Sequence, residues 1–203
     1  MKRALGPIAK RFNIVLHVHA TRLADVPVGE SVVFFVREPA SRYVSGFNSR
    51  LRMGRPMLNV PWNAAEARAF GRFVTPNSLA EALSDEDDDL RRAAHAAMRE
   101  VRHVNQRISY WLGDMAALEN RRADILMIGQ TERLAASFRK LKMSLGLPEA
   151  IVLPTDPFDA HVTPGGYERK LSEKASRNVQ EWYAVDYELW RRILSGFGGL
   201  KAV

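Results

Sequence analysis

The stretch Ser31-Val-Val-Phe-Phe-Val-Arg-Glu-Pro-Ala-Ser-Arg-Tyr-Val-Ser45 decides the fold of this chain. Its first part, Val32 to Val36, is an apolar run of β-branched and aromatic residues, which predicts a strand buried on both faces. Pro39 predicts the start of a helix, because the first helical turn has N–H groups without acceptors and therefore tolerates proline. The stretch thus predicts a strand followed directly by a helix. Arg37 lies at the end of the strand, and Ser45 lies within the helix.

A strand-to-helix junction of this kind is a common ligand site in α/β proteins. Ligands in an open α/β sheet lie beyond the carboxyl ends of the strands, beside the N-termini of helices. Arg37 offers a planar fork of donors suited to phosphate oxygens, and Ser45 adds a hydroxyl. We therefore expect these two residues to bind a phosphate. The alternative is an ordinary junction with an exposed arginine.

The segment Val36-Arg-Glu-Pro-Ala-Ser-Arg-Tyr-Val-Ser-Gly-Phe47 resembles the 3′-phosphate-binding motif of the sulfotransferase family. These enzymes move a sulfuryl group from 3′-phosphoadenosine-5′-phosphosulfate to a hydroxyl or an amine. The resemblance implies that Arg37 and Ser45 hold the 3′-phosphate of this donor. Arg42, Arg50 and Arg52 follow on the same predicted helix and form either a basic rim around the nucleotide or acceptor or a solvated helix face, and Arg42 is a further nucleotide-binding candidate. It also implies an α/β fold: a single domain over residues 1–203, with a three-layer parallel sheet of the P-loop nucleoside triphosphate hydrolase type and a helix-rich C-terminal half.

Composition sets limits on the class of protein. The chain has 203 residues, 46% of them hydrophobic, which is the size and apolar content of a globular domain with a core. The absence of cysteine excludes disulfides and thiolate metal sites. A net charge of +7 favours anionic partners such as nucleotides. No apolar run is long enough to span a bilayer and no signal peptide is recognisable, so we expect a cytoplasmic protein.

Other apolar patterns predict the remaining elements. Residues 13–19 and 123–129 are predicted to be strands, and residues 2–12 and 134–145 are predicted to be helices. The sequence Gly129-Gln-Thr-Glu132 after the later strand also resembles the sulfotransferase family, where this segment is mostly architectural. Further helices are predicted over residues 40–52, 64–73, 90–104 and most of 172–195, with Ser78 as the cap of another.

Two histidines at the end of the first predicted strand are candidate general bases. The ordinary pKa of histidine, about 6.5, suits proton transfer near neutral pH. The pair His17 and His19 resembles the His-x-His of the polysaccharide 2-O-sulfotransferases, in which the second histidine is the base. This resemblance implies that His19 is the base and that His17 supports it. Apart from the resemblance, His161 in a later loop is the next candidate. The alternatives are a packed or hydrogen-bonded pair, or two metal ligands without the others.

A glycine-containing loop of the type Lys-x-Gly-Thr-Thr, with which sulfotransferases hold the 5′-phosphosulfate, is missing from this sequence. In the family, a helix follows the loop directly, and residues 2–12 resemble that helix. We therefore expect that the sequence begins after the loop and after the first strand, as a truncated reading frame would. A natural variant without the loop is the alternative. In either case we expect the chain as given to bind its donor weakly.

Two charged segments have more than one interpretation. Arg169 and Lys170 lie in a loop that is rich in proline and glycine, where related sulfotransferases place a basic segment over the nucleotide; a plain surface loop is the alternative. The acidic run from Ser84 to Asp89 predicts capping of the following helix, with a metal site as the less favoured interpretation. We expect no metal cofactor.

Taken together, these features favour a sulfotransferase that acts on a hydroxyl of a carbohydrate or another acceptor. A non-catalytic member that binds a nucleotide or an anionic glycan is the alternative. A basic nucleic-acid-binding protein is disfavoured, because the arginines are scattered and no known binding module is present. The expected partners are therefore the nucleotide donor and a small-molecule or carbohydrate acceptor, without nucleic acid and without an integral membrane segment.

Overall fold

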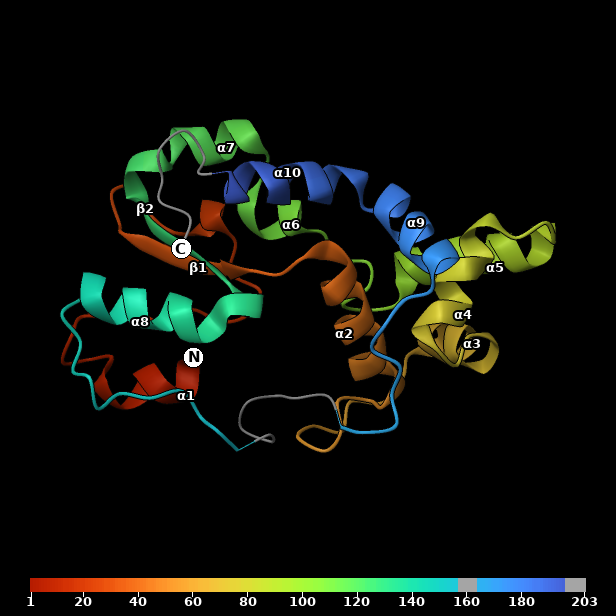
Figure 1. Ribbon diagram of the computed structural model, residues 1–203, viewed down its shortest axis with the longest axis horizontal. Coiled ribbons are helices and arrows are strands. Elements are labelled where there is room, and N and C mark those ends of the chain that lie inside the picture. Colours follow the sequence, from red (N-terminus) through yellow and green to blue (C-terminus); the bar gives the residue numbers. More distant parts are fainter. Residues whose placement is uncertain (157–163, 196–203) are drawn as a thin grey trace. The chain divides into compact units, whose positions relative to one another are not determined.

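A computed structural model describes residues 1–156 and 164–195 of the chain (Figure 1). The chain divides into two compact units, each with its own core. The sheet unit consists of Met1–Arg37, Ile108–Val162 and Glu188–Val203. The helical unit consists of Glu38–Arg107 and Thr163–Tyr187. A single domain over residues 1–203 stays a prediction.

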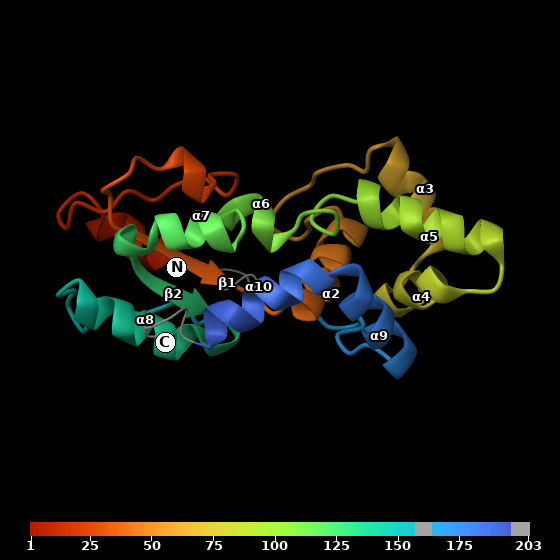
Figure 2. The same ribbon diagram turned by 90° about the horizontal axis from the view of Figure 1, so that it is seen from above.

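The sheet unit is built on two strands, β1 (Val32–Val36) and β2 (Ile125–Gln130), which pair in parallel (Figure 2). Strand β1 has the predicted bounds, and β2 begins and ends slightly later than predicted. A parallel pair needs a long connection between its strands. The first segment of the helical unit, from Glu38 to Arg107, lies within that connection.

The strand predicted over residues 13–19 is wrong, because this segment pairs with no strand in the described part of the chain. Some of its apolar side chains are nevertheless packed: Ile14 and Leu16 contact an apolar cluster, whereas Val15 and Val18 are 72% and 71% exposed. The backbone amide of Ile14 donates to the carbonyl of Ala9 over 2.8 Å rather than to a neighbouring strand. The parallel pair and its helices confirm the α/β class, while the P-loop type of sheet stays a prediction.

Strand β2 carries one residue more than the segment of β1 that it faces. Val32 is paired with Ile125 and Val33 with Met127, so that Leu126 is left over. Leu126 is 43% exposed, although Ile125 and Met127 on either side are buried. A bulge of this kind shifts the alternation of side chains by one residue.

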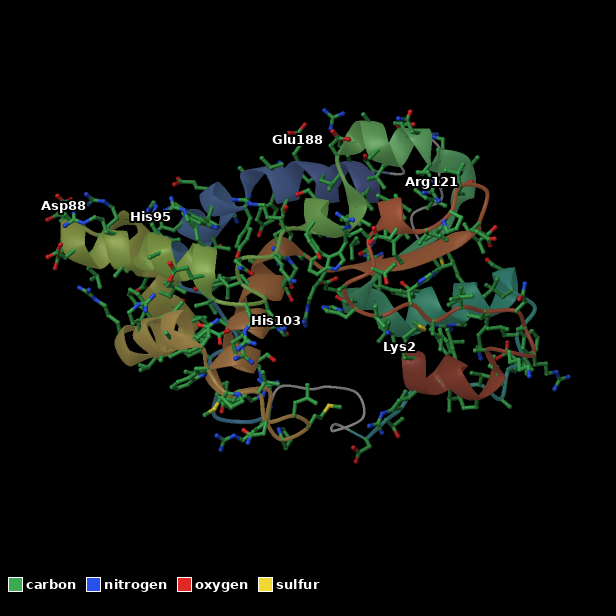
Figure 3. All side chains as sticks on the ribbon, turned by 180° about the vertical axis from the view of Figure 1, so that it is seen from behind. Lys2, Asp88, His95, His103, Arg121 and Glu188 are labelled. Atoms are coloured by element: carbon green, nitrogen blue, oxygen red, sulfur yellow. The ribbon has the colours of Figure 1, made fainter. Side chains whose placement is uncertain are left out.

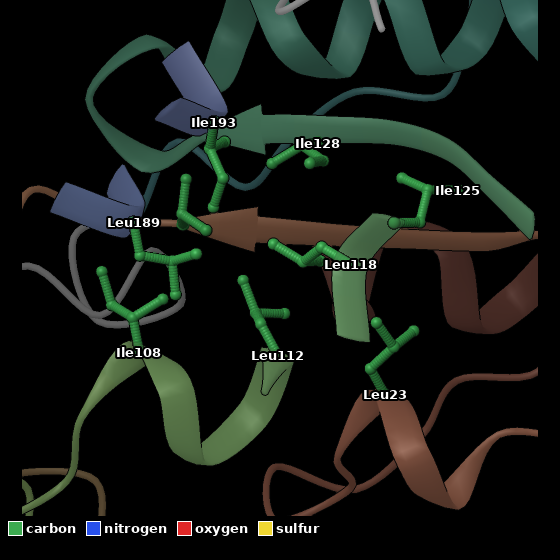
Figure 4. Packing of buried hydrophobic residues seen from close by; sticks show 9 residues of the cluster. Leu23, Ile108, Leu112, Leu118, Ile125, Ile128, Leu189 and Ile193 are labelled. Carbon is green, nitrogen blue, oxygen red and sulfur yellow. The ribbon is translucent and has the colours of Figure 1, made fainter. Parts of the chain in front are cut away.

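Apolar clusters pack on both faces of the strand pair, but β1 is less buried than predicted: Val36 is buried, and Val32 to Phe35 are half-buried. Val32, Phe34 and Val36 take part in the first cluster, and Val33 and Phe35 take part in the second. The buried members of the first cluster (Figure 4) are Leu23, Val36, Ile108, Leu112, Leu118, Ile125, Ile128, Leu189 and Ile193. Those of the second are Leu5, Met127, Phe138, Leu141 and Leu147.

Gly129 allows the two strands to accommodate an aromatic ring. It is paired with Phe35, and a Cβ at position 129 would lie 2.3 Å from the Phe35 ring. A glycine within a strand often marks such a close approach.

Short helices pack around the strand pair. The predicted helix over residues 2–12 ends early, at Leu5, because Pro7 has no N–H group to continue the α-helical hydrogen bonds, and a single 3-10 turn follows. The helices of this unit are α1 (Lys2–Leu5), α6 (Ile108–Leu112), α7 (Met115–Asn120), α8 (Leu134–Ser144) and the C-terminal part of α10 (Ala184–Leu194). Single 3-10 turns lie at Gly6–Ile8, Leu23–Asp25, Arg122–Asp124 and Thr131–Arg133.

The helical unit gathers around α2 (Pro39–Leu51), which has nearly its predicted bounds. Tyr43 and Phe47 on α2 are 0% exposed and form part of the core. The other helices are α3 (Ala64–Arg72), α4 (Pro76–Glu81), α5 (Asp88–Glu100), α9 (Glu173–Trp182) and the start of α10, with one 3-10 turn at Ala82–Ser84. Thr75, not Ser78 as predicted, caps α4, and Ser78 closes the capping box three residues later.

A buried ion cluster crosses the core of this unit. Glu66 on α3 is 0% exposed and accepts from Arg50 on α2 over 2.7 and 2.8 Å. Arg102, after α5, donates to the same carboxylate over 3.0 and 2.6 Å. Two planar guanidinium forks thus bind one carboxylate, a geometry that stabilises a buried charge. Burial would raise the pKa of Glu66, but the hydrogen bonds from Arg50, Arg102 and the Asn63 backbone outweigh it and hold this pKa well below its ordinary value.

Candidate functional site

The junction between β1 and α2 is fixed by Glu38, whose role was not predicted. One carboxylate oxygen of Glu38 caps α2 by accepting from the backbone amide of Ser41 over 2.6 Å. The hydroxyl of Tyr187 donates to the other oxygen and accepts from the amide of Ala40. The sequence signal was an acidic residue directly before the helix-starting Pro39, which suits the positive end of a helix.

The two residues expected to bind the 3′-phosphate belong to different units. Arg37 directly follows β1, is exposed and is the last residue of the first segment of the sheet unit. Ser45 is half-buried on α2 in the helical unit. Their role in phosphate binding stays a prediction, and the eight-residue spacing across one junction is what supports it.

Arg42 is engaged by groups of its own unit. Its guanidinium donates to the carboxylate of Asp186 over 3.0 Å and to the carbonyl of Gln106, and it lies 5.1 Å from the centre of the Tyr183 ring. The Asp186 side chain is 0% exposed and that of Arg42 is 13% exposed. This arrangement links α2 to α10 and to the loop after α5. A direct contact of Arg42 with a nucleotide stays a prediction.

Gly46 lets α2 approach that same loop closely. A Cβ at position 46 would lie 3.1 Å from both the Cβ and the carbonyl oxygen of His103, which is labelled in Figure 3. Any larger residue at position 46 would have to displace the backbone of His103. The glycine of the Ser-Gly-Phe sequence is thus explained by packing of α2.

Another face of α2 carries Ser45 and Asn48, one turn apart, and Arg52, which caps the C-terminal end of α2, follows Asn48 by four residues. Residues 164–172 follow this face: Asn48 donates to the carbonyl of Glu168 over 2.7 Å, and the Arg52 guanidinium lies 5.8 Å from the centre of the Tyr167 ring. Burial lowers the pKa of Arg52 from its ordinary value. Within the helical unit, the segment with Arg169 and Lys170 is therefore brought to the helix face that also carries Ser45.

Arg169 and Lys170 are both exposed. One guanidinium nitrogen of Arg169 donates to the carbonyl of Pro164 over 3.3 Å. The asparagines that hold the backbone of this segment, Asn48 and Asn77, were not predicted as functional. Their partners are backbone groups about ninety residues or more along the chain, which no local sequence pattern indicates.

The two candidate bases lie in the segment that forms no strand. His17 and His19 are both exposed. The carbonyl of His19 accepts from the indole N–H of Trp111 over 3.0 Å, and the two rings lie 5.7 Å apart. His19 is thus held against α6 within the sheet unit. Its role as a base and the supporting role of His17 stay predictions, and His161 lies outside the described residues.

The acidic run before α5 acts as a helix cap. Asp87 accepts from the backbone amides of Asp89 and Leu90 over 2.8 and 3.2 Å, and these bonds lower its pKa. Among the residues that the structure describes, no three histidine or acidic side chains are grouped so that they could hold a metal ion. Across the same residues, no helix is both long enough and apolar enough to cross a membrane.

Strand β1 leads through the junction capped by Glu38 into α2, and Arg37 lies at the end of the strand. This arrangement is typical of α/β proteins, in which a ligand site is expected at such a junction. Residues 10–191 match the model of the sulfotransferase family. The chain therefore belongs to the sulfotransferase family, as its resemblance in sequence implied. Searches of curated proteins and of solved structures give no match to this chain.

Proposed function

We propose that this chain transfers a sulfuryl group from 3′-phosphoadenosine-5′-phosphosulfate to a hydroxyl of a carbohydrate or another acceptor. The observation that supports this most strongly is the junction of β1 and α2, which lies within the family match. There, Arg37 ends the strand segment and Ser45 follows on a helix whose start is fixed by Glu38. The P-loop type of sheet belongs to the same proposal.

The proposed reaction is a direct displacement at sulfur. The acceptor oxygen attacks the sulfur atom and forms a new S–O bond, while the bond from sulfur to the bridging phosphate oxygen breaks. The nucleotide leaves as 3′-phosphoadenosine-5′-phosphate. His19 takes the proton of the acceptor hydroxyl, with His17 in support.

The nucleotide is held mainly by cations. Arg37 and Ser45 bind the 3′-phosphate through charge-assisted hydrogen bonds, and Arg169 and Lys170 add positive charge. Arg42 is the weakest of these candidates, because its guanidinium already binds Asp186 and the Gln106 carbonyl.

Calorimetric titration of the full chain with 3′-phosphoadenosine-5′-phosphate and with 5′-AMP tests the proposal. We expect tighter binding of the first, and a loss of about 10- to 100-fold for Arg37→Ala, the size of a lost charged hydrogen bond. Arg139, an exposed arginine on α8, provides the matched control, because Arg139→Ala lies outside the junction of β1 and α2. Equal binding of the two nucleotides would contradict the proposal.

A non-catalytic role is the second candidate, since the sequence contains no loop of the Lys-x-Gly-Thr-Thr type. Transfer of radiolabelled sulfate from the donor to a panel of polysaccharides separates the two. A catalytic chain loses transfer in His19→Ala without losing affinity for 3′-phosphoadenosine-5′-phosphate. Nucleotide binding without transfer to any acceptor would favour the non-catalytic role.

A further inference from the structure

Two asparagines of the helical unit hold the backbone of the segment that carries Arg169 and Lys170, where it runs beside α2 toward α9 (Figure 1). The Asn48 amide donates to the carbonyl of Glu168 over 2.7 Å. The Asn77 amide donates to the carbonyl of Lys170 over 3.0 Å and to the Glu168 carboxylate over 2.9 Å. The side-chain oxygen of Asn77 also accepts from the backbone amide of Ser172 over 2.8 Å.

We propose that Asn48 and Asn77 are positioning residues that set the affinity for the 3′-phosphate by fixing the backbone around Arg169 and Lys170. This inference rests on the proposed function, because it assigns the fixed cations to the nucleotide donor. We call the contacts of these two asparagines with residues 168–172 the asparagine bracket.

The bracket binds the backbone and leaves the cations available. Glu168 and Lys170 are held through their carbonyl groups and Ser172 through its amide, whereas the side chains of Arg169 and Lys170 are exposed. Fixing one residue of a loop costs about 1–2 kcal/mol in conformational entropy. A segment that is already fixed before the ligand arrives does not lose this entropy again on binding, and its affinity is higher for that reason.

The asparagine bracket holds the segment with Arg169 and Lys170 beside the face of α2 that carries Ser45. Asn48 lies one turn after Ser45 on α2, and Arg52 lies one turn further on, over the Tyr167 ring. A loss of the bracket would release the basic segment from this face while leaving Ser45 in place. The bracket therefore acts on the nucleotide through Arg169 and Lys170, not by contact.

The Asn48 amide is buried at a cost, and its donor binds the segment that carries the cations. Its side chain is 1% exposed, and its oxygen has no hydrogen-bond partner among the described residues. A buried acceptor without a donor costs about 1–3 kcal/mol, which an apolar residue at this position would avoid. Only a donor at this position, however, can bind the Glu168 carbonyl.

The test measures nucleotide selectivity and protease sensitivity on the same variants of the full chain. For Asn77→Ala we expect the affinity for 3′-phosphoadenosine-5′-phosphate to fall about tenfold, equivalent to about 1.4 kcal/mol, with unchanged affinity for 5′-AMP. Trypsin, which cuts after arginine and lysine, should cleave after Arg169 and Lys170 faster than in the parent. Asn48→Ala should act in the same direction.

Asn178 provides the matched control for a buried structural amide. It donates to the carbonyl of Ala80 and to the Ser84 hydroxyl over 2.8 Å each, in the same unit, and these partners are not among residues 168–172. Asn178→Ala should lower stability without changing the preference for the 3′-phosphate. If Asn77→Ala does not fold, Asn77→Asp serves instead, because it keeps the acceptor for Ser172 and loses the donor to both the Lys170 carbonyl and the Glu168 carboxylate.

A double-mutant comparison distinguishes positioning from general destabilisation. If the bracket acts through the cations, Asn77→Ala has no further effect on nucleotide affinity in an Arg169→Ala/Lys170→Ala background. Additive losses, or a tenfold loss for both nucleotides alike, would overturn the inference. Equal binding of both nucleotides by the parent would instead overturn the proposed function, and with it the ligand assigned to the bracket.

Discussion

The sheet unit and the helical unit are stabilised by different kinds of interior. In the sheet unit, two apolar clusters meet the two faces of β1 and β2, and the buried cation Lys142, beside Phe138, pairs with Glu149, whose side chain is 90% exposed. In the helical unit, Glu66 and Asp186 are both 0% exposed, and each is bound by arginine. Apolar contacts lose stability gradually when side-chain size changes, whereas a buried charge is strongly destabilising once its partner is removed.

The two buried carboxylates also share a helix as their partner. Arg50 and Arg42, which bind Glu66 and Asp186, both come from α2. The charged interior thus fixes the orientation of the helix that carries Ser45 and Asn48. From this comparison we expect the helical unit to respond sharply to single charge changes, and the sheet unit to respond to changes in side-chain volume.

The largest expected effect is that of Glu66→Ala. Its removal leaves Arg50, whose side chain is 4% exposed, as a buried charge without a carboxylate, and this should cost about 3–5 kcal/mol of unfolding free energy. Chemical denaturation followed by tryptophan fluorescence measures the loss, since the Trp62 indole donates to the Arg50 carbonyl and reports on this region. A loss below about 1 kcal/mol, the upper range for exposed pairs, would contradict the comparison.

The sheet unit should be most sensitive at Gly129. In Gly129→Ala, the new Cβ would meet the Phe35 ring at 2.3 Å, and overpacking of this kind should cost about 1–3 kcal/mol. Thermal unfolding of the variant measures it. Gly71 on α3 is the matched control, because a Cβ there meets nothing within 4 Å, and Gly71→Ala should stabilise by about 0.5–1 kcal/mol. Trimming the ring in Gly129→Ala/Phe35→Leu should recover part of the loss; equal losses in the single and double variants would rule out the ring as the cause.

Acid should weaken the helical unit through Glu66. Because the pKa of Glu66 in the folded chain lies well below its ordinary value of 4.5, its contribution is complete above that value and is lost as the pH falls. The expected slope is about 1.4 kcal/mol per pH unit for this one proton. The pKa values of Asp25, Asp87 and Asp124 are lowered as well, so the measurement compares the parent with Glu66→Gln between pH 3 and pH 7 (about the range of carboxylate titration). Identical slopes in the two proteins would show that Glu66 does not contribute.

The parts of the fold that could be predicted are those encoded locally. The apolar run of β1 and the proline at position 39 define a strand and a helix start within a few residues, and both predictions are confirmed. The segment of residues 13–19 has the same local pattern as a strand but no partner strand in the described chain, which only the tertiary structure reveals. The family, too, could be recognised from the short segment between Val36 and Phe47.

The polar interior could not be predicted, because its partners are distant in sequence. Arg42 and Arg50 were open to interpretation as a basic rim or a solvated face, but their carboxylates lie 144 and 16 residues away. The bracket has the same character, since Asn48 and the Glu168 carbonyl are 120 residues apart. Asparagine and arginine on a helix look alike whether they face solvent or a buried partner, and only the fold decides between the two.

The smallest expected effect comes from an ion pair of the same unit that lies at its surface. Arg68 and Glu100 approach to 3.4 Å with side chains 69% and 47% exposed, and Arg68→Ala should cost less than about 1 kcal/mol, because water screens both charges. The denaturation used for Glu66→Ala measures it, and added salt should reduce it further. Glu66 and the Arg68 pair both connect α3 with α5 or the loop after it, so the two variants differ chiefly in burial. A loss at Arg68 as large as that at Glu66 would mean that any charge pair at this helix contact stabilises the unit, and burial would no longer explain why the two interiors respond differently.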